Sequence, residues 1–176
     1  MDPGVHRLQG ETGVVSDLAE LLGAFHREKL ATVLRHQAGA RLVRGYDANN
    51  VYQYAVNRGE VQLTWVRRAL EELGAPEPEP VDEPSRAVPG RGPGADAAVL
   101  REDGADAAAF VARWTPRVDA MDHARHRKML RVILGEMVEQ ARAFDQSAAG
   151  RDDVLGRHNP RNAPPAGEVL ATRWVE

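Results

Sequence analysis

The sequence predicts an all-α protein, an up-down bundle of helices interrupted by a crossover that is rich in proline and glycine. Three observations lead to this fold class. Apolar residues recur at the three- and four-residue spacing of helices in two long regions. No run of alternating apolar and polar residues, the pattern of a half-buried strand, occurs in the sequence. Between the two regions the composition changes to Pro, Gly and acidic residues, which neither helices nor strands tolerate well.

Residues 12–74 are expected to form a helical hairpin. The first helix has Ser16 as a plausible N-cap, and its apolar stripe consists of Leu18, Leu21, Leu22, Phe25, Val33 and Leu34. The sequence GYDANN then provides the turn, with Asp47 or Asn49 to start the second helix and Gly74 to end it. Because the turn between the two long helices is short, we expect them to be antiparallel.

Residues 75–104 are expected to form a linker. The segment APEPEPVDEPSRAVPGRGPGAD alternates Pro with acidic residues and then Pro with Gly. The length suits a crossover that runs along the whole bundle, which two hairpins need if the second is to pack parallel to the first. A plain loop is the other interpretation, and it is compatible with a crossover.

The helical pattern returns over residues 105–150, with Pro116 inside it. Pro116 either begins a new helix or kinks one long helix, and the pattern alone does not choose between these. Residues 151–176 are mostly irregular, yet Val169, Leu170, Trp174 and Val175 are too apolar for a free tail. We therefore expect this extension to pack on the bundle or on a second subunit, with a homodimer as the assembly.

Length, charge and composition exclude several classes of function. A chain of 176 residues can bury one ordinary core, so residues 1–176 are expected to form a single domain. With 23 basic and 26 acidic residues the formal net charge is −3, which predicts neither a nucleic-acid nor a membrane partner. The absence of cysteine excludes disulfides, thiol nucleophiles and iron–sulfur clusters. Without a signal peptide or a long apolar run, the chain is expected to be cytoplasmic.

Glu28 and Glu60 are the carboxylates that a metal site in the first hairpin would use. They lie at about the same level across the hairpin, and a dinuclear site in a bundle takes carboxylates from two helices and Glu-x-x-His pairs from two others. The chain has Leu63 where that pattern has His, with Gln62 beside it as a weak carbonyl donor. Because the helical phase places both glutamates near the edge of the apolar side, solvated boundary residues are the alternative interpretation.

The stretch MDHARHRKML, residues 121–130, contains a candidate metal-binding or proton-handling histidine. His126 lies on the apolar stripe of this region, one turn from Asp122, which would orient the ring for metal binding or proton transfer. A core histidine satisfied by Asp122 and a backbone carbonyl is the alternative. His26 and His36 point toward the apolar side of the first helix, and His26 is a further candidate ligand.

The segment NNVYQYAVNRGEVQLTWVRRALEELGA resembles the second helix of ferritin-like proteins, in which an acidic residue is followed by an apolar stripe and a closing Leu-x-x-Leu-Gly. With Glu28, the resemblance covers Ser16 to Ala75. It implies a ferritin-like bundle with a crossover, which in the family often holds two iron or manganese ions and performs ferroxidase, peroxide or oxygen chemistry. Glu28 and Glu60 match the carboxylates of the first half-site. Leu63 departs from its histidine, and the second half contains no Glu-x-x-His.

A second, shorter resemblance involves the histidines. The segment HARHRKML is similar to the last helix of DinB-like bundles, which hold one divalent metal with three histidines and are associated with thiol-dependent transferase activity. In that interpretation His26 or His36 would complete a set with His126.

Two functional hypotheses follow from these residues. The first is a metal-binding protein with oxidoreductase-type iron or oxygen chemistry that uses some of Glu28, Glu60, Asp122 and His126, with His26 as an extra ligand. Its cofactor would be iron or manganese, or none if the site is degenerate. The second is a non-catalytic helical interaction or structural protein, in which the same polar groups only specify packing.

Overall fold

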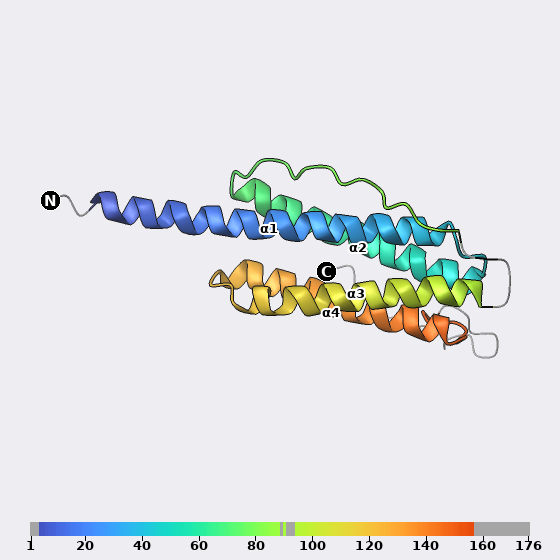
Figure 1. Cartoon of the computed structure of the whole chain (residues 1–176). Coiled ribbons are helices and arrows are strands. Elements are labelled where there is room, and N and C mark those ends of the chain that lie inside the picture. Colours follow the sequence, from blue (N-terminus) through green and yellow to red (C-terminus); the bar gives the residue numbers. More distant parts are fainter. Residues whose placement is uncertain (1–3, 89, 91–93, 157–176) are drawn as a thin grey trace, which may run out of the picture.

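The computed structural model describes residues 4–88, 90 and 94–156, with side chains from residue 17 onward, and this part of the chain is all-α. Within it lie four helices, α1 (Gly4–Ala40), α2 (Tyr46–Glu72), α3 (Ala95–Asp119) and α4 (Ala124–Ala148), and no strand (Figure 1). The predicted all-α class is therefore confirmed for these residues. None of the described helices is both long and apolar enough to cross a membrane.

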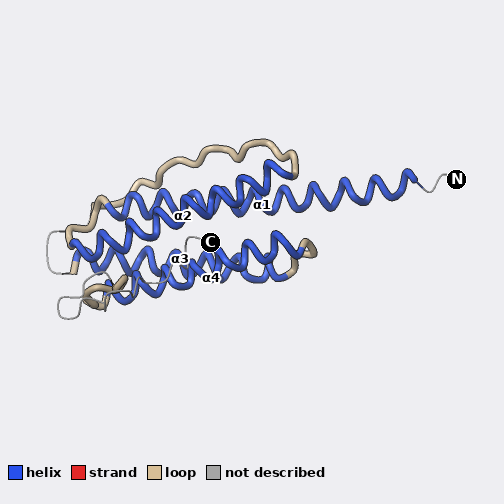
Figure 2. Tube along the Cα trace, turned by 180° about the vertical axis from the view of Figure 1, so that it is seen from behind, coloured by secondary structure: helices blue, strands red, loops and turns tan. Residues whose placement is uncertain are grey.

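The helices pair as two hairpins that pack against each other. α1 packs on α2 and on α3, while α4 packs on α3 and on α2. Figures 1 and 2 show the segment between α2 and α3 running back along the α1–α2 hairpin, so that α2 and α3 point in the same direction. The sequence-predicted crossover is thus present, although it ends at Gly94 and not near residue 104. The first turns of α1 extend beyond the other helices (Figure 1).

Two helix starts differ from the sequence predictions. α1 begins at Gly4, so Ser16 lies inside the helix and does not cap it. α3 begins at Ala95 and not at residue 105, because the segment ADAAVLREDG contains no proline and is rich in alanine, the strongest helix former.

The second helical region is two helices. Pro116 neither begins a helix nor kinks a continuous one, because it lies near the end of α3, which stops at Asp119. A short turn, Ala120–His123, then reverses the chain. The stretch 121–130 therefore forms this turn and the beginning of α4, and does not lie in the middle of a long helix.

Glycine ends α2 as predicted. Gly74 has a φ of +66°, and the amide of Ala75 donates to the carbonyl of Leu70 while the amide of Gly74 donates to that of Glu71. This is the Schellman arrangement, which satisfies the last carbonyls of a helix and needs a left-handed residue that glycine adopts without strain. The next chain segment is thereby turned away from the helix axis into the crossover.

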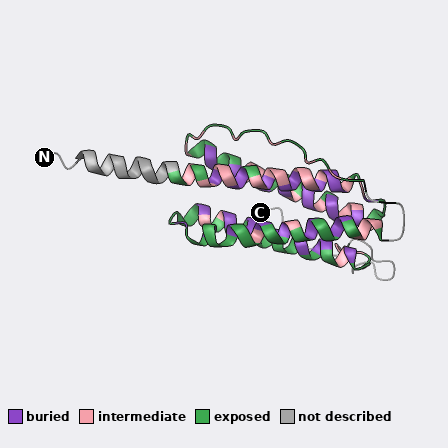
Figure 3. Ribbon diagram, in the orientation of Figure 1, coloured by how far each residue is buried: buried purple, intermediate pink, exposed green. Residues whose placement is uncertain are grey.

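Buried residues lie along the length of the bundle (Figure 3), and the apolar ones among them form two clusters. One cluster contains Phe25, Phe110 and Trp114, and the other contains Tyr52 and Phe144. Between them lie six buried polar residues, which we call the polar layer: Lys29, Thr32, His36, Gln62, Asp103 and Gln140. All four helices contribute to it. Since burying polar groups is costly unless they are hydrogen-bonded, this layer is the feature that the apolar core does not explain.

The described part of the C-terminal extension packs on the bundle. Val154 and Leu155 lie against the cluster that contains Tyr52 and Phe144. The predicted packing of Val169, Leu170, Trp174 and Val175 lies outside the described residues.

The close approach of α1 and α2 at Gly59 gives a testable prediction. A Cβ atom at Gly59 of α2 would lie 2.5 Å from Cγ2 of Val33 of α1, whereas a Cβ at Gly23 of α1 would meet nothing within 4 Å. Gly23→Ala is expected to stabilise the protein by up to about 1 kcal/mol through helix propensity. Gly59→Ala is expected to lose about 1–3 kcal/mol through overpacking. Urea unfolding of both variants measures the difference, and equal stabilisation by both would contradict the close packing.

Candidate functional site

Glu28 faces α3 and not the second helix. Its Oε2 accepts hydrogen bonds from Nε1 of Trp114 at 2.9 Å and from a guanidinium nitrogen of Arg113 at 3.2 Å. The carboxylate is thus engaged by an indole and a cation from the neighbouring hairpin. Such a carboxylate anchors the α1–α3 contact.

Glu60 lies on the exposed side of α2. Its Oε1 is 3.5 Å from Nε2 of Gln37 on α1. Glu28 and Glu60 therefore have different neighbours, because Glu28 contacts α3 and Glu60 contacts Gln37, nine residues further along α1. The buried polar side chain of this part of α2 is Gln62, and Leu63 is half-buried.

His36, one of the two histidines predicted to complete a set with His126, lies far from His126 along the bundle. The rings of His36 and Phe144 have centroids 4.9 Å apart, and Phe144 is eighteen residues beyond His126 on α4. At the helical rise of about 1.5 Å per residue, this places His36 and His126 about 27 Å apart along the axis. His26 and His36, ten residues apart on α1, are separated by about 15 Å.

The neighbour of His126 is His123 and not Asp122. Asp122 is exposed and lies in the turn before α4, whereas His126 is buried. The Nδ1 atoms of His123 and His126 are 2.9 Å apart, and their ring centroids are 4.3 Å apart. The predicted one-turn pairing of Asp122 with His126 is wrong because it assumed that both residues belong to one helix.

The predicted ligands do not converge in the described structure. Within residues 17–88, 90 and 94–156, no group of three His, Asp or Glu side chains is arranged so that it could hold a metal ion. Glu136, which is half-buried on α4, binds the guanidinium of Arg58 and accepts a hydrogen bond from Gln62. The carboxylate is thus held by protein donors.

Lys29 lies in the polar layer and is completely buried. Its Nζ is 2.8 Å from the sulfur of Met137, a weak acceptor, and 3.7 Å from the position that a Cβ of Gly59 would take. Burial lowers the pKa of Lys29 from 10.5 to about 7, and the carboxylate of Glu136 opposes part of this shift. A neutral amine is therefore well populated near pH 7.

His36 is the second residue of the polar layer whose pKa is strongly lowered. Burial, followed by the positive charges of Lys29, Arg35 and Arg86, lowers its pKa to about 3. The ring is consequently neutral at pH 7. Neither ring nitrogen has a hydrogen-bond partner among the described residues, and the same holds for both amide atoms of Gln140.

Asp103 organises the polar layer on the α3 side. Its Oδ1 accepts a hydrogen bond from Nε of Arg35 at 2.7 Å. Its Oδ2 accepts from the hydroxyl of Tyr52 at 2.5 Å and from Nη1 of Arg86 at 2.6 Å. The two arginines come from α1 and from the crossover, and Glu102 binds both of them from the outside. One buried carboxylate therefore joins three helices and fastens the crossover to the bundle.

Sequence reasoning missed Lys29 and Asp103, although a signal existed for each. Lys29 stands four residues from Phe25 and from Val33, on the apolar stripe of α1, and Asp103 lies between Leu100 and Ala107 on that of α3. A charged residue at a core position of an amphipathic helix indicates a buried polar network. The predicted apolar stripe of α1 did not include position 29, so the lysine at this core position was overlooked.

Comparison with protein-family models, with curated proteins and with solved structures finds no match for this chain. The functional interpretation therefore depends on the geometry of the described residues.

Proposed function

We propose that this protein is a non-catalytic helical interaction or structural protein, built on a ferritin-like bundle whose interior contains a buried amine in place of bound metal. The observation that carries the proposal is the position of Lys29. Its Nζ lies inside the bundle between α1, α2 and α4, beside Met137 and opposite Gly59. This is the region where facing helices of a metal-binding bundle bring their ligands together.

The chemistry of the surrounding side chains supports the same proposal. The amine of Lys29, when protonated, repels a divalent cation, and Gln62 and Gln140 are neutral amides that bind metals weakly. The carboxylates that remain near the interior, Glu136 and Asp103, are engaged by arginines. A divalent ion would have to displace these arginines before it could bind.

The ferritin-like part of the proposal is supported by the order of the elements. A helical hairpin, a crossover along the bundle and a second hairpin follow one another, as the sequence resemblance implies (Figure 1). In this proposal the ancestral metal site has been lost, and the function lies on the surface of the bundle. The homodimer stays a prediction, and sedimentation velocity would measure the oligomeric state.

Metal analysis tests this proposal. Purified full-length protein, incubated anaerobically with iron(II), manganese(II) or zinc(II) and then desalted, is expected to retain far less than one ion per chain. Its thermal unfolding midpoint is expected to be the same with and without a chelator, because a ligand that does not bind the native state cannot stabilise it. Retention of about two iron or manganese ions per chain would support a dinuclear site and contradict the proposal.

A matched variant shows the origin of any metal that is retained. Glu28→Gln removes the carboxylate that the sequence resemblance assigns to a metal, and Glu139→Gln changes an exposed glutamate of α4 as the control. If metal is retained and is lost only in Glu28→Gln, the oxidoreductase hypothesis replaces the one proposed here. About one zinc ion per chain, lost in His126→Ala, would favour the histidine-based alternative.

A further inference from the structure

The outer side of α4 is exposed and partly apolar. α4 packs on α3 and on α2 with its buried side, while Val132 and Val138 are 52% and 43% exposed among the described residues. Valine is a poorer helix former than the charged residues around it, so helix propensity does not account for these two positions. The two side chains are apolar surface that a partner could cover.

Gly135 lies at the centre of this exposed side. It stands midway between the two valines, and at 3.6 residues per turn it lies opposite the buried stripe of α4, which contains Leu130, Ile133 and Met137. A Cβ atom at Gly135 would meet nothing within 4 Å, so packing among the described residues does not require glycine there. Since glycine weakens a helix, its presence favours a role between chains, where it lets another helix come close.

Opposite charges are placed symmetrically about Gly135. Arg131 precedes it by four residues and Glu139 follows it by four, about one turn on each side. Both side chains are more than half exposed, and their partners within the chain are exposed too: Arg131 is 2.8 Å from Asp119, and Glu139 is 3.1 Å from Arg142. If two copies of α4 pair antiparallel about a two-fold axis at Gly135, Arg131 of each copy faces Glu139 of the partner subunit.

The apolar residues obey the same symmetry. Val132 and Val138 each lie three residues from Gly135, so each valine faces the other one in the second copy. Lys128 and Arg142, seven residues from Gly135, are the like-charged pair of this arrangement. Helices that cross at about 50° have diverged two turns from their contact, and Arg142 is bound to a carboxylate of its own chain. The surface is therefore complementary to itself near the crossing point.

We propose that this surface, which we call the α4 face and which consists of Arg131, Val132, Gly135, Val138 and Glu139, binds the α4 face of a second copy of the chain. The two helices cross at Gly135, and the guanidinium of Arg131 donates to the carboxylate of Glu139 of the partner subunit on both sides of the crossing. The valines are buried between them. A contact of one helix pair is small, so the dissociation constant of the dimer is expected to be roughly 10–100 µM.

This inference rests on the proposed surface function and names its partner. The two can nevertheless fail separately, because metal retention tests the interior of the bundle and self-association tests α4. Sedimentation velocity of the full-length protein, at concentrations from about 5 to 500 µM, is expected to show a sedimentation coefficient that rises with concentration.

Charge reversals locate the contact. Arg131→Glu and Glu139→Arg each place like charges opposite each other, and each is expected to weaken self-association at least about tenfold. Because exposed ion pairs contribute little to folding, both variants are expected to stay folded, which circular dichroism checks. Arg101→Glu reverses an exposed charge on α3 and is the control, expected to associate like the unmodified protein.

Two combinations restore the opposite charges. The double variant Arg131→Glu/Glu139→Arg is expected to associate like the unmodified protein. An equimolar mixture of the two single variants is expected to form a heterodimer, although each variant alone stays largely monomeric. Gly135→Gln introduces a good helix former that fills the crossing point, so it is expected to weaken the dimer without lowering the thermal unfolding midpoint of dilute protein.

The proposal is overturned if the unmodified protein stays monomeric over the whole concentration range. It is equally overturned if both single reversals associate like Arg101→Glu, because another surface or residues 157–176 would then hold the dimer. Failure of both the double variant and the mixture to recover association would also contradict the pairing of Arg131 with Glu139 of the partner subunit.

Discussion

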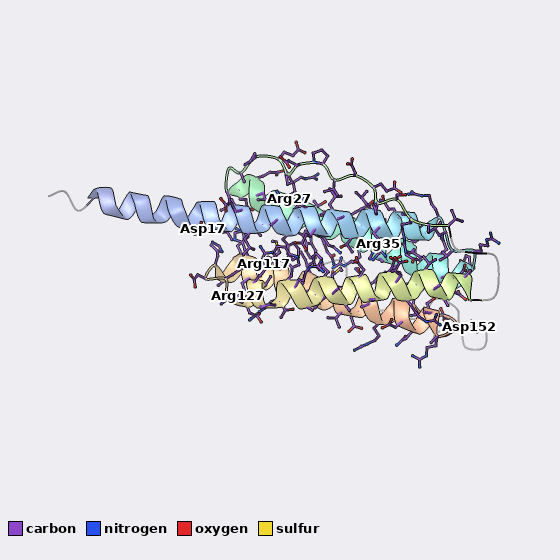
Figure 4. All side chains as sticks on the ribbon, in the orientation of Figure 1. Asp17, Arg27, Arg35, Arg117, Arg127 and Asp152 are labelled. Atoms are coloured by element: carbon purple, nitrogen blue, oxygen red, sulfur yellow. The ribbon has the colours of Figure 1, made fainter. Side chains whose placement is uncertain are left out.

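Asp103→Ala is expected to lower the free energy of unfolding by about 3–5 kcal/mol, because it leaves buried cationic and hydroxyl groups without their partner. The carboxylate accepts hydrogen bonds from Arg35, Arg86 and Tyr52, and its side chain is completely buried. Figure 4 shows Arg35 on α1, at the contact between the two hairpins. Without Asp103, the guanidinium of Arg86, whose side chain is only 6% exposed, keeps Glu102 and the carbonyl of Arg35 but loses its buried carboxylate partner.

Urea unfolding at neutral pH measures this effect, with Asp106→Ala as the control. Asp106 lies on the same helix one turn later, is 41% exposed and is 3.8 Å from Arg35, so its loss is expected to cost about 0–1 kcal/mol. Asp103→Asn keeps one hydrogen-bond acceptor for Tyr52 and is expected to fall between the two. Equal losses for Asp103→Ala and Asp106→Ala would contradict the organising role of Asp103.

Lys29→Met is expected to stabilise the protein, and the gain is expected to depend on pH. In the folded protein the pKa of Lys29 is about 7, whereas in the unfolded chain it is near 10.5. Between these values the unfolded state binds more protons, so the stability of the unmodified protein rises with pH across this window. The buried methionine carries no charge, and it places an apolar chain of similar length beside Met137.

The predicted signature is the difference in unfolding free energy between Lys29→Met and the unmodified protein. It is expected to be largest, several kcal/mol, at or below pH about 7, and to shrink by about 1.4 kcal/mol per pH unit above it. Lys128→Met is the control, since Lys128 is exposed on α4 and is the other lysine of the sequence. Taking the difference removes the titration of groups that Lys29 does not influence. His36, whose pKa the charge of Lys29 helps to lower to about 3 in the folded protein, titrates there well below this window. A difference that does not change with pH would contradict a titrating amine in the core.

Several elements of the fold were predictable because their signals are local. The apolar stripes of α1, α2 and α4, the end of α2 at Gly74 and the Pro-rich crossover depend on the periodicity or conformational preference of a few neighbouring residues. The predicted start of α3 was wrong, and the break after Asp119 was not predicted. The Pro- and Gly-rich composition continues close to Ala95, which made the start of α3 hard to place. Pro116 was taken as the point of change in the helical pattern, whereas the turn follows it.

The candidate site was less predictable, because its residues become neighbours only when the hairpins pack. The sequence by itself determined that helices would form, where the crossover lies and that thiol chemistry is excluded. Only the tertiary structure decided that Glu28 turns to Trp114, that His126 lies beside His123, and that Arg86 of the crossover reaches Asp103. The physical reason is that helical periodicity specifies which side of a helix is buried, whereas the partner of a buried charge is set by the rotation and level at which distant helices pack.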